Sequence, residues 1–229
     1  MQNSNLGDRI KRYENAYDFK LTPRSCVFIR IDGRAFHTFT KNCVKPFDQG
    51  LITAMVSAAK ETAYEMMGFK LAYHQSDEVT FMLTDFDKLT TEGWFGYELN
   101  KIVSLSASIF TAAFNRYYPS GEGKATFDSR AFVVPLDDAP NVFIWRQQDW
   151  ERNSLQMLAR SVFPHKDLIG KNRSDMHEML FNVGVNWTAL SPREKNGTFI
   201  KRDKTLESDK VTYATLSAYF EEVLSEDTA

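Results

Sequence analysis

Alternating and continuous apolar positions predict four strands in the first two thirds of the chain. Two runs rich in β-branched and aromatic residues, 26–31 and 127–134, are typical of buried strands. Two shorter runs, 70–73 and 79–83, flank the polar stretch 74–78. Such spacing predicts a hairpin with a polar loop at its tip.

Helical periodicity occupies the segments between and around these strands. Apolar residues recur at spacings of three and four over 48–67, and Gly68 is placed to end that helix. Residues 94–118 predict a long helix with many small side chains. Shorter or more polar patterns predict a charged, exposed helix over 8–15 and another helix over 142–163.

The resulting order is strand, helix, hairpin, helix, strand, which predicts a βαββαβ plan of the α+β class. In this ferredoxin-like plan an antiparallel sheet is backed by two helices. We expect a palm- or cyclase-like core over residues 1–140 and a helical C-terminal extension over 141–229, packed together as one unit. Polymerase palms, nucleotide cyclases and RNA-recognition modules share this plan, so the fold alone does not identify the function.

Composition narrows the class of protein only slightly. The chain has 229 residues, of which 43% are hydrophobic and 25% charged, enough to bury a full core. Its formal net charge of −2 means that any nucleic-acid surface must be local. The basic residues that could form one, or that could form only a solvated face, lie in the C-terminal part: Lys166, Lys171, Arg173, Arg193, Lys195, Lys201, Arg202 and Lys204.

Cysteine and histidine spacing argues against a disulfide framework and against zinc. Cys26 and Cys43 belong to no C-x-x-C pair, and Cys26 starts an apolar run typical of core. No segment approaches the ~20 apolar residues of a membrane span, and the N-terminus lacks a signal-peptide core. We therefore expect a cytoplasmic protein without a membrane anchor.

Three carboxylates follow strands that should be neighbours. Asp32 comes directly after the first strand, and Asp77 and Glu78 lie at the predicted hairpin tip. Carboxylate oxygens are the ligands that Mg²⁺ prefers, and such a sheet edge can hold two ions about 4 Å apart. The alternative is that all three are ordinary turn residues.

The neighbourhood of these carboxylates favours the functional interpretation. Gly33 allows a phosphate or metal to approach the backbone, and Arg34 and His37 add charge and donors. Lys45 and Asp48 flank the start of the next helix, where backbone N–H groups favour an anion. Three segments thus offer what a nucleoside triphosphate with magnesium requires.

Other polar residues are weaker candidates. Lys101 and Ser104 share one helical face and could contact a nucleotide, while Arg130 could reach a triphosphate or an RNA. Phe143 and Trp145, near the start of an amphipathic helix, are predicted to be core residues rather than a base-stacking platform.

Five motifs, in order, carry a resemblance to a known family. They are Arg30-Ile-Asp-Gly-Arg-Ala-Phe-His37, Lys45-Pro-Phe-Asp48, Tyr73-His-Gln-Ser-Asp-Glu78, Phe127-Asp-Ser-Arg130 and Trp145-Arg-Gln-Gln-Asp149. Together they are similar to the motifs of the tRNA-His guanylyltransferase family, over a stretch from about Leu6 to about Phe181.

The resemblance implies a two-metal nucleotidyltransferase that acts on tRNA. Asp32, the Gly33 backbone and Asp77 would bind two Mg²⁺ ions, and Asp32, Asp77 and Glu78 would be the catalytic carboxylates. The expected nucleotide-binding residues are Asp32, Gly33, Arg34, Ala35, Phe36, His37, Lys45, Asp48, Ser76, Asp77, Lys101, Ser104 and Arg130. The expected tRNA-binding residues are Arg146, Asn153, Lys171 and Arg173.

The family's chemistry sets the expected substrates and assembly. Members typically adenylylate a tRNA 5′-monophosphate with ATP, after which the 3′-hydroxyl of an incoming nucleotide such as GTP attacks the activated end. The Lys45 and Asp48 region would bind the triphosphate used in that activation. Family members also tend to form homotetramers, and the small-residue helix over 94–118 could serve such packing.

One departure from the family pattern separates two activities. The eukaryotic enzymes carry His-Ile-Asn-Asn, a segment linked to adding an untemplated guanosine, where this chain has Glu151-Arg-Asn-Ser154. Met176 also replaces an expected lysine, whose charge Lys171 or Arg173 could supply. The departure favours templated repair of 5′-truncated tRNA. Guanosine addition to tRNA-His, a cyclase and a non-catalytic RNA-binding module are the alternatives.

Overall fold

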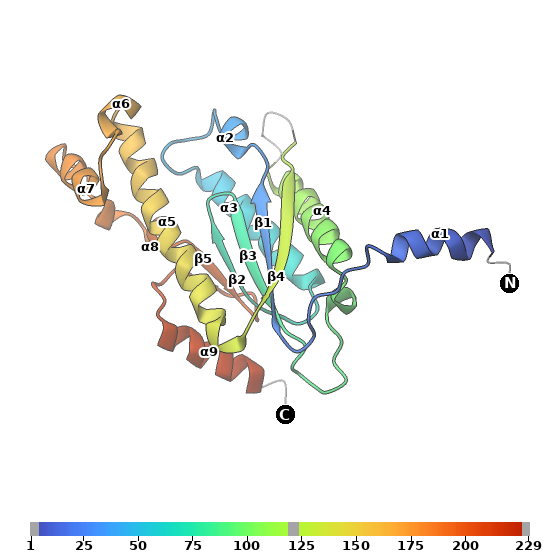
Figure 1. The fold of residues 1–229 in the computed structure, drawn as a ribbon. Coiled ribbons are helices and arrows are strands. Elements are labelled where there is room, and N and C mark those ends of the chain that lie inside the picture. Colours follow the sequence, from blue (N-terminus) through green and yellow to red (C-terminus); the bar gives the residue numbers. More distant parts are fainter. Residues whose placement is uncertain (1–4, 119–123, 226–229) are drawn as a thin grey trace.

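A single antiparallel sheet organises the protein. The computed structural model describes residues 5–118 and 124–225 (Figure 1). Within these ranges the strands are β1 (Cys26–Gly33), β2 (Phe69–Gln75), β3 (Glu78–Leu83), β4 (Phe127–Val134), β5 (Thr198–Lys201) and β6 (Leu206–Glu207). They are ordered β4-β1-β3-β2-β5-β6, and every neighbouring pair is antiparallel.

Helices cover both faces of this sheet. Those of the described ranges are α1 (Leu6–Asn15), α2 (Phe36–Phe39), α3 (Gln49–Glu65), α4 (Leu99–Tyr117), α5 (Ala139–Val162), α6 (His165–Leu168), α7 (Arg173–Asn182), α8 (Pro192–Asn196) and α9 (Tyr213–Ser225). Single 3₁₀ turns precede α4, α5 and α8. No helix in the described ranges has the length and apolar character needed to cross a lipid bilayer.

The predicted βαββαβ plan is confirmed, with an addition from the C-terminal part. The order β1-α3-β2-β3-α4-β4 is the expected one. The extension, expected to be helical, also contributes β5 and β6, since β5 pairs with the free edge of β2. β5 is only four residues long, so its alternation is too brief to be distinguished from a loop in the sequence.

Alternation along β1 divides the core into two layers. Val27, Ile29 and Ile31 point to the face covered by α3 and α4, where they join the largest apolar cluster. Phe28 points to the opposite face and packs with Phe143 of α5 and neighbouring aromatic rings. Every side chain of β1 on the first face therefore serves the core, and the polar residues Arg30 and Asp32 must lie on the second.

The long helix α5 belongs to two layers at once. Its first half covers the sheet, and its second half packs against α7 through Leu155, Leu158 and Leu180. Figure 1 shows α6 and α7 lying beside this second half, on the side away from the sheet. At the end of the sheet where β1 terminates, α5 therefore covers only the β3 side of this face, whereas Asp128 and Arg130 of β4 are exposed.

One predicted helix differs from its expected form, and another forms as expected. The segment expected to be helical over 94–118 begins with a separate turn, because Phe95, Gly96 and Tyr97 adopt positive φ angles that an α-helix does not allow. Helix α1 forms as expected, and Asn5 accepts a hydrogen bond from its first turn. It buries none of its residues and projects from the body (Figure 1).

Gly68, in the connection between α3 and β2, leaves no space for a side chain. Its φ is +78°, and a Cβ there would lie 2.1 Å from the Thr84 carbonyl oxygen. Gly170 has a similar φ of +76°, but a Cβ there would meet nothing within 4 Å. Gly170→Ala should therefore cost only the left-handed strain, about 1–2 kcal/mol, and Gly68→Ala should cost more because the backbone must also move.

Urea unfolding of both variants measures the difference. Equal losses in the free energy of unfolding would contradict the close approach of Gly68 to Thr84.

Candidate active site

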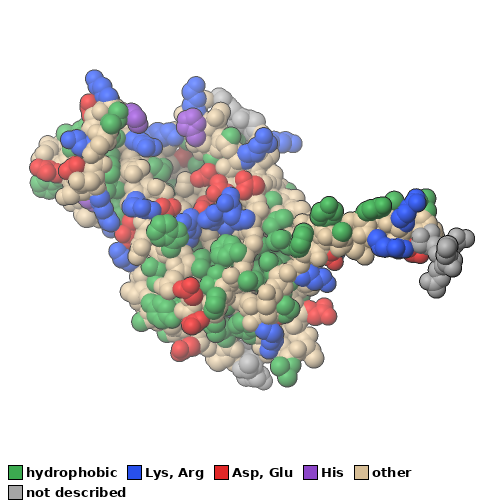
Figure 2. Space-filling view, viewed as in Figure 1, with side chains coloured by type: hydrophobic (Ala, Val, Ile, Leu, Met, Phe, Trp, Pro, Cys, Tyr) green, Lys and Arg blue, Asp and Glu red, His purple; other side chains and the backbone are tan. Residues whose placement is uncertain are grey.

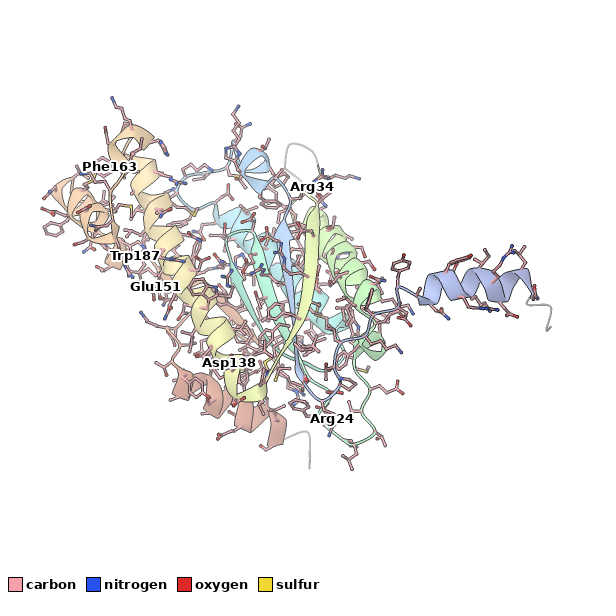
Figure 3. All side chains as sticks on the ribbon, viewed as in Figure 1. Arg24, Arg34, Asp138, Glu151, Phe163 and Trp187 are labelled. Atoms are coloured by element: carbon pink, nitrogen blue, oxygen red, sulfur yellow. The ribbon has the colours of Figure 1, made fainter. Side chains whose placement is uncertain are left out.

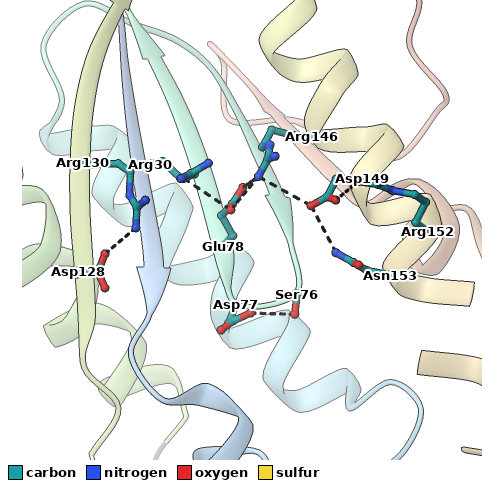
Figure 4. Close-up of polar contacts among 10 residues, drawn as sticks. All are labelled: Arg30, Ser76, Asp77, Glu78, Asp128, Arg130, Arg146, Asp149, Arg152 and Asn153. Atoms are coloured by element: carbon teal, nitrogen blue, oxygen red, sulfur yellow. Dashed lines mark hydrogen bonds and ion pairs between the residues drawn. The ribbon is translucent and has the colours of Figure 1, made fainter. Parts of the chain in front are cut away.

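Three carboxylates form a row across the sheet. Asp32 of β1 stands opposite Asp128 of β4 on one side and Glu78 of β3 on the other. Directly opposed residues in a sheet point to the same face, so all three lie on the face of α5. The next row of the same face contains Arg130 and Arg30 (Figure 4). An acidic row and a basic row thus lie side by side at this end of the sheet.

A tight turn brings a fourth carboxylate to this row. Ser76 and Asp77 connect β2 to β3, and Ser76 has a φ of +51°. The Ser76 hydroxyl donates to Asp77 Oδ1 at 2.9 Å, and the Gly33 N–H donates to the Asp77 carbonyl at 3.0 Å. The second bond fixes the turn to the end of β1, so Asp32 and Asp77 are held near each other.

The expected polar loop of residues 74–78 is therefore wrong in its extent. His74 and Gln75 continue β2 and Glu78 begins β3, because their backbones pair in register across the hairpin. His74 is buried, its Nε2 bonds to the Ser76 carbonyl at 3.0 Å, and burial lowers its pKa to about 4. A neutral His74 at pH 7 can brace the turn from beneath.

The surroundings of Asp32 and Asp77 disfavour their ionised forms. Burial raises the pKa of Asp77, to which the charges of Asp32 and Glu78 add, although its bond from Ser76 acts in the opposite direction. Burial also raises the pKa of Asp32, and the charge of Asp128 adds to this effect. A bound cation would relieve both carboxylates, because an opposite charge favours the ionised form.

The donor set of this pair suits a hard divalent cation. Carboxylate and carbonyl oxygens match Mg²⁺, which usually takes one or two carboxylates and completes its shell with water and phosphate. In the described ranges no three His, Cys, Asp or Glu side chains gather into a metal site of their own. Asp32, Asp77 and the Gly33 carbonyl are therefore the residues that could hold the ion, together with oxygens from a substrate.

Glu78 differs from the other two predicted catalytic carboxylates because it is engaged by arginines. Arg146 Nη1 lies 3.2 Å from both of its oxygens, and Arg30 Nε lies 3.7 Å from one of them. Arg146 also approaches Asp149, at 3.9 Å (Figure 4). These contacts tie α5 to β3, and the Arg146 side chain is only 11% exposed.

A cavity of ≈ 400 Å³ opens beside Asp77. It lies between α2, the start of α3, the β2–β3 turn, α5 and α8, and its lining is mainly apolar. Concave, mostly apolar pockets with a few polar groups are typical of small-molecule sites. The polar lining consists of His37, Thr40, Lys45, Asp48, His74, Gln75, Ser76, Asp77, Arg160 and Arg193.

The predicted Lys45–Asp48 motif shapes one wall of this cavity. Asp48 caps α3, accepting from the Leu51 N–H at 2.8 Å and from the Val44 N–H at 3.1 Å. Lys45 donates to the Thr40 carbonyl at 3.0 Å and remains exposed. The Asp48 carboxylate is thus used to fix the loop around the cavity, while the Lys45 ammonium stays accessible to a ligand.

Some of the predicted nucleotide-binding residues lie at this end of the sheet, and others lie far from it. Arg34 lies at the end of the sheet near α2 (Figure 3), and its neighbours Ala35, Phe36 and His37 continue into α2. Arg130 pairs with Asp128 at 3.5 Å in the rows described above.

Lys101 and Ser104 are not brought to the carboxylates. They occupy the first turns of α4, on the other face of the sheet. The Lys101 ammonium pairs with Glu98 at 2.8 Å, and the Ser104 hydroxyl donates to the Asn100 carbonyl at 2.6 Å.

The predicted tRNA-binding residues beyond Arg146 lie along α5 and α7. Asn153 donates to Asp149, at 3.4 Å. Arg173 pairs with Glu151 at 3.6 Å and stacks on Trp187, two residues labelled in Figure 3. Lys171 is exposed beside Arg160 in a smaller cavity. Met176, where the resemblance predicted a lysine, is buried against α5.

Trp145 was predicted to be a core residue, and this is wrong. Phe143 is fully buried as expected, but Trp145 is 53% exposed and has the guanidinium groups of Arg146 and Arg152 over its ring. Two residues turn a helix through about 200°, so Phe143 and Trp145 must face opposite sides. Sequence reasoning also missed Arg160 as a lining residue, because no motif contains it.

The surface reflects this arrangement of charge. Figure 2 shows acidic side chains gathered in a hollow near the centre of this face, with lysine and arginine side chains around it. A nucleotide or RNA would meet local positive charge here although the whole chain is slightly acidic.

Comparison with known proteins identifies the family. A family model described as tRNAHis guanylyltransferase matches residues 7–135, more than half of the chain. A probable tRNA(His) guanylyltransferase of Dictyostelium discoideum is 31% identical, over 83% of this chain and 80% of that protein. An uncharacterised mimivirus protein, R259, is 29% identical over 95% of this chain and 84% of its own length.

Solved structures extend the similarity to nearly the whole chain. A bacterial tRNA(His) guanylyltransferase-like protein in complex with ATP is 45% identical, with a TM-score of 0.91 and coverage of 96% of this chain and 99% of that one. A second such structure, in complex with GTP, is 40% identical, with a TM-score of 0.79 and coverage of 96% and 98%. From the motifs, the fold and these relatives together, the chain belongs to the tRNA(His) guanylyltransferase family of nucleotidyltransferases.

Proposed function

We propose that this protein adds nucleotides to the 5′ end of tRNA in the 3′-to-5′ direction, as templated repair of truncated tRNA. The observation that carries the proposal is the Asp32–Asp77 pair, fixed by the Gly33–Asp77 backbone bond, with Asp77 lining the ≈ 400 Å³ cavity. The ATP and GTP complexes of bacterial relatives support nucleoside triphosphates as its substrates.

Magnesium completes the proposed site. Asp32, Asp77 and the Gly33 carbonyl would hold two ions, which would lower the pKa of the attacking hydroxyl and stabilise the pyrophosphate leaving group. The polypeptide itself would orient the substrates: Ser76, His37 and Lys45 line the cavity and would bind triphosphate oxygens. Glu78, held by Arg30 and Arg146, would act as an accessory carboxylate that keeps α5 in place beside the metals.

The segment that departs from the family pattern supports repair rather than guanosine addition. Glu151 is buried and pairs with Lys210 at 2.8 Å and Arg173 at 3.6 Å. The Ser154 hydroxyl accepts from Trp187 Nε1 at 3.0 Å. Two of the four residues that replace His-Ile-Asn-Asn are thus used for packing between α5, α7 and the following turn. They are not available to recognise tRNA-His.

Guanosine addition is the second candidate. The curated relative from Dictyostelium discoideum is named for it, and the present site geometry would serve both reactions. We further propose a cytoplasmic location, where tRNA substrates occur. We also propose a homotetramer, for which the open groove lined by Ser104, Ala107 and Ser108 along α4 offers a surface of small side chains.

A nucleotide-addition assay distinguishes the two activities. The substrates are a 5′-truncated tRNA and a tRNA-His that lacks its extra guanosine, each with magnesium, ATP and one of the four nucleotides. We expect addition to the truncated tRNA that follows the opposing base. Guanosine added only to tRNA-His, whatever the opposing base, would make the chain a guanylyltransferase. Absence of addition to both would leave a cyclase or a non-catalytic RNA-binding module.

Asp32→Asn and Asp77→Asn should each reduce nucleotide addition by a factor of at least about 1000, because each removes a metal ligand while preserving shape. Their thermal unfolding should show an intact fold. The matched control is Asp128→Asn, the exposed third member of the row, whose addition rate should stay within about threefold of wild type. If this control loses activity as completely as Asp32→Asn, the metal pair is Asp32–Asp128 instead.

Lys45→Ala should affect the activation step most. Its ammonium is accessible in the cavity wall, and the family pattern links this region to the activating triphosphate. Single-turnover rates should fall about 10-fold or more on 5′-monophosphorylated tRNA, and far less on tRNA that already carries a 5′-triphosphate. An equal loss on the two substrates would remove Lys45 from activation.

A further inference from the structure

Arg193 lines the cavity and has no ion-pair partner among the described residues. It belongs to the short helix α8, outside the segment matched by the family model, and its side chain lines the cavity together with Ser76 and Asp77. Within the described ranges its guanidinium forms no hydrogen bond and no ion pair, and its Nε is buried. A half-buried arginine of this kind is unusual, because arginine is normally paired when it is removed from water.

The adjacent acidic residue in the chain is bonded to other groups. Glu194 follows Arg193 directly, but its Oε2 accepts from the Ser191 N–H at 3.0 Å and the Ser191 hydroxyl at 2.8 Å, in a capping box of α8. Its Oε1 accepts from Gln49 Nε2 at 2.9 Å. Both oxygens of Glu194 are therefore occupied, and the Arg193 donors remain free for a ligand.

Other polar atoms around the cavity also lack partners. His74 Nδ1, Gln75 Oε1 and Trp150 Nε1 belong to residues that line the cavity, and in the described ranges these buried atoms form no hydrogen bond. Thr198 Oγ1, next to the lining residue Gly197, is also buried and forms no hydrogen bond with any described residue. Because buried polar groups are normally satisfied, this gathering indicates that a polar ligand or its bound water completes the cavity.

The balance of charge in the cavity favours an anion. Lys45, Arg160 and Arg193 are its cationic lining residues, and Asp48 and Asp77 are its acidic ones. Asp48 already accepts two backbone N–H groups, and Asp77 accepts the Ser76 hydroxyl. Arg160 likewise forms no ion pair with any described residue. Burial lowers the pKa of Arg193, so the protein bears a cost for keeping this charge in place.

We propose that Arg193, supported by Arg160, binds phosphate oxygens in this cavity. The fork of an arginine guanidinium matches two oxygens of one phosphate, and such bonds strengthen away from bulk water. The phosphate belongs either to a bound nucleoside triphosphate or to the 5′ end of the tRNA. The inference rests on the proposed function for the identity of these ligands.

The test combines two variants with a control from the same helix. Arg193→Met removes the charge but keeps the length of the side chain, and Arg193→Lys keeps the charge without the fork. Lys195→Met is the matched control, because Lys195 donates to the Thr188 carbonyl at 2.8 Å instead of lining the cavity. Affinities of the full chain are measured for Mg-ATP, inorganic tripolyphosphate, adenosine, and truncated tRNA with a 5′-monophosphate or a 5′-hydroxyl.

Arg193→Met should weaken binding of ATP and tripolyphosphate about 10-fold or more, the loss of a charge-assisted hydrogen bond. Arg193→Lys should lose less affinity for these two ligands. The affinity of Arg193→Met for adenosine should equal that of wild type, as should all affinities of the Lys195→Met control. A loss confined to the 5′-monophosphorylated tRNA, with the 5′-hydroxyl form unchanged, would assign the phosphate to the RNA end and support the proposal equally.

Thermal unfolding separates this role from a structural one. Removing an unpaired, half-buried charge should leave the Tm of Arg193→Met unchanged or higher. A lower Tm with all affinities within twofold of wild type would overturn the proposal and make the guanidinium a packing element. Binding is measured without turnover, so failure of wild-type protein to extend tRNA would reject the proposed function but not the phosphate assignment.

Discussion

The position of β1 between β3 and β4 is the constraint on which the site depends. Its register places Asp32 between Glu78 and Asp128, and the Gly33–Asp77 backbone bond fixes the hairpin turn to its end. A shift of one residue would turn Asp32 into the apolar layer beneath and bring Ile31 to the surface. The apolar side chains of β1 that fill the core therefore also determine where the carboxylates stand, so packing and catalytic geometry are set together.

A second layer of polar contacts positions the helix that completes the site. Arg146 bonds to both oxygens of Glu78, and through this pair α5 is held over the start of β3. Farther along, α5 packs on α7, while its residues Trp150, Met157 and Arg160 form part of the cavity wall. The geometry therefore combines a rigid catalytic edge with a pocket whose far wall comes from the C-terminal part of the chain.

Much of this arrangement could be predicted from residue patterns alone. Strand and helix periodicities predicted the strands β1 to β4 and their order along the chain, since alternation and helical spacing are local properties. The turn around Ser76 and Asp77 was expected to be longer, because polar residues in strands resemble loop residues unless their pairing is known. The prediction for Trp145 was wrong for a similar reason. Its helix was predicted, but which side of that helix packs on the sheet depends on the tertiary structure.

The sequence by itself determined the family, the palm-like plan and the carboxylates at the strand ends, because each is recorded in short, ordered motifs. Tertiary structure decided which side chains share the cavity. Arg160 and Arg193 lie far from Ser76 in the chain and carry no motif, and only the packing of α5 and α8 brings them to it. Lys101 and Ser104 were candidates because of their helical spacing. They lie away from the carboxylates because α4 covers the other face of the sheet. Contacts between distant segments depend on the summed packing of the whole sheet, which no local pattern contains.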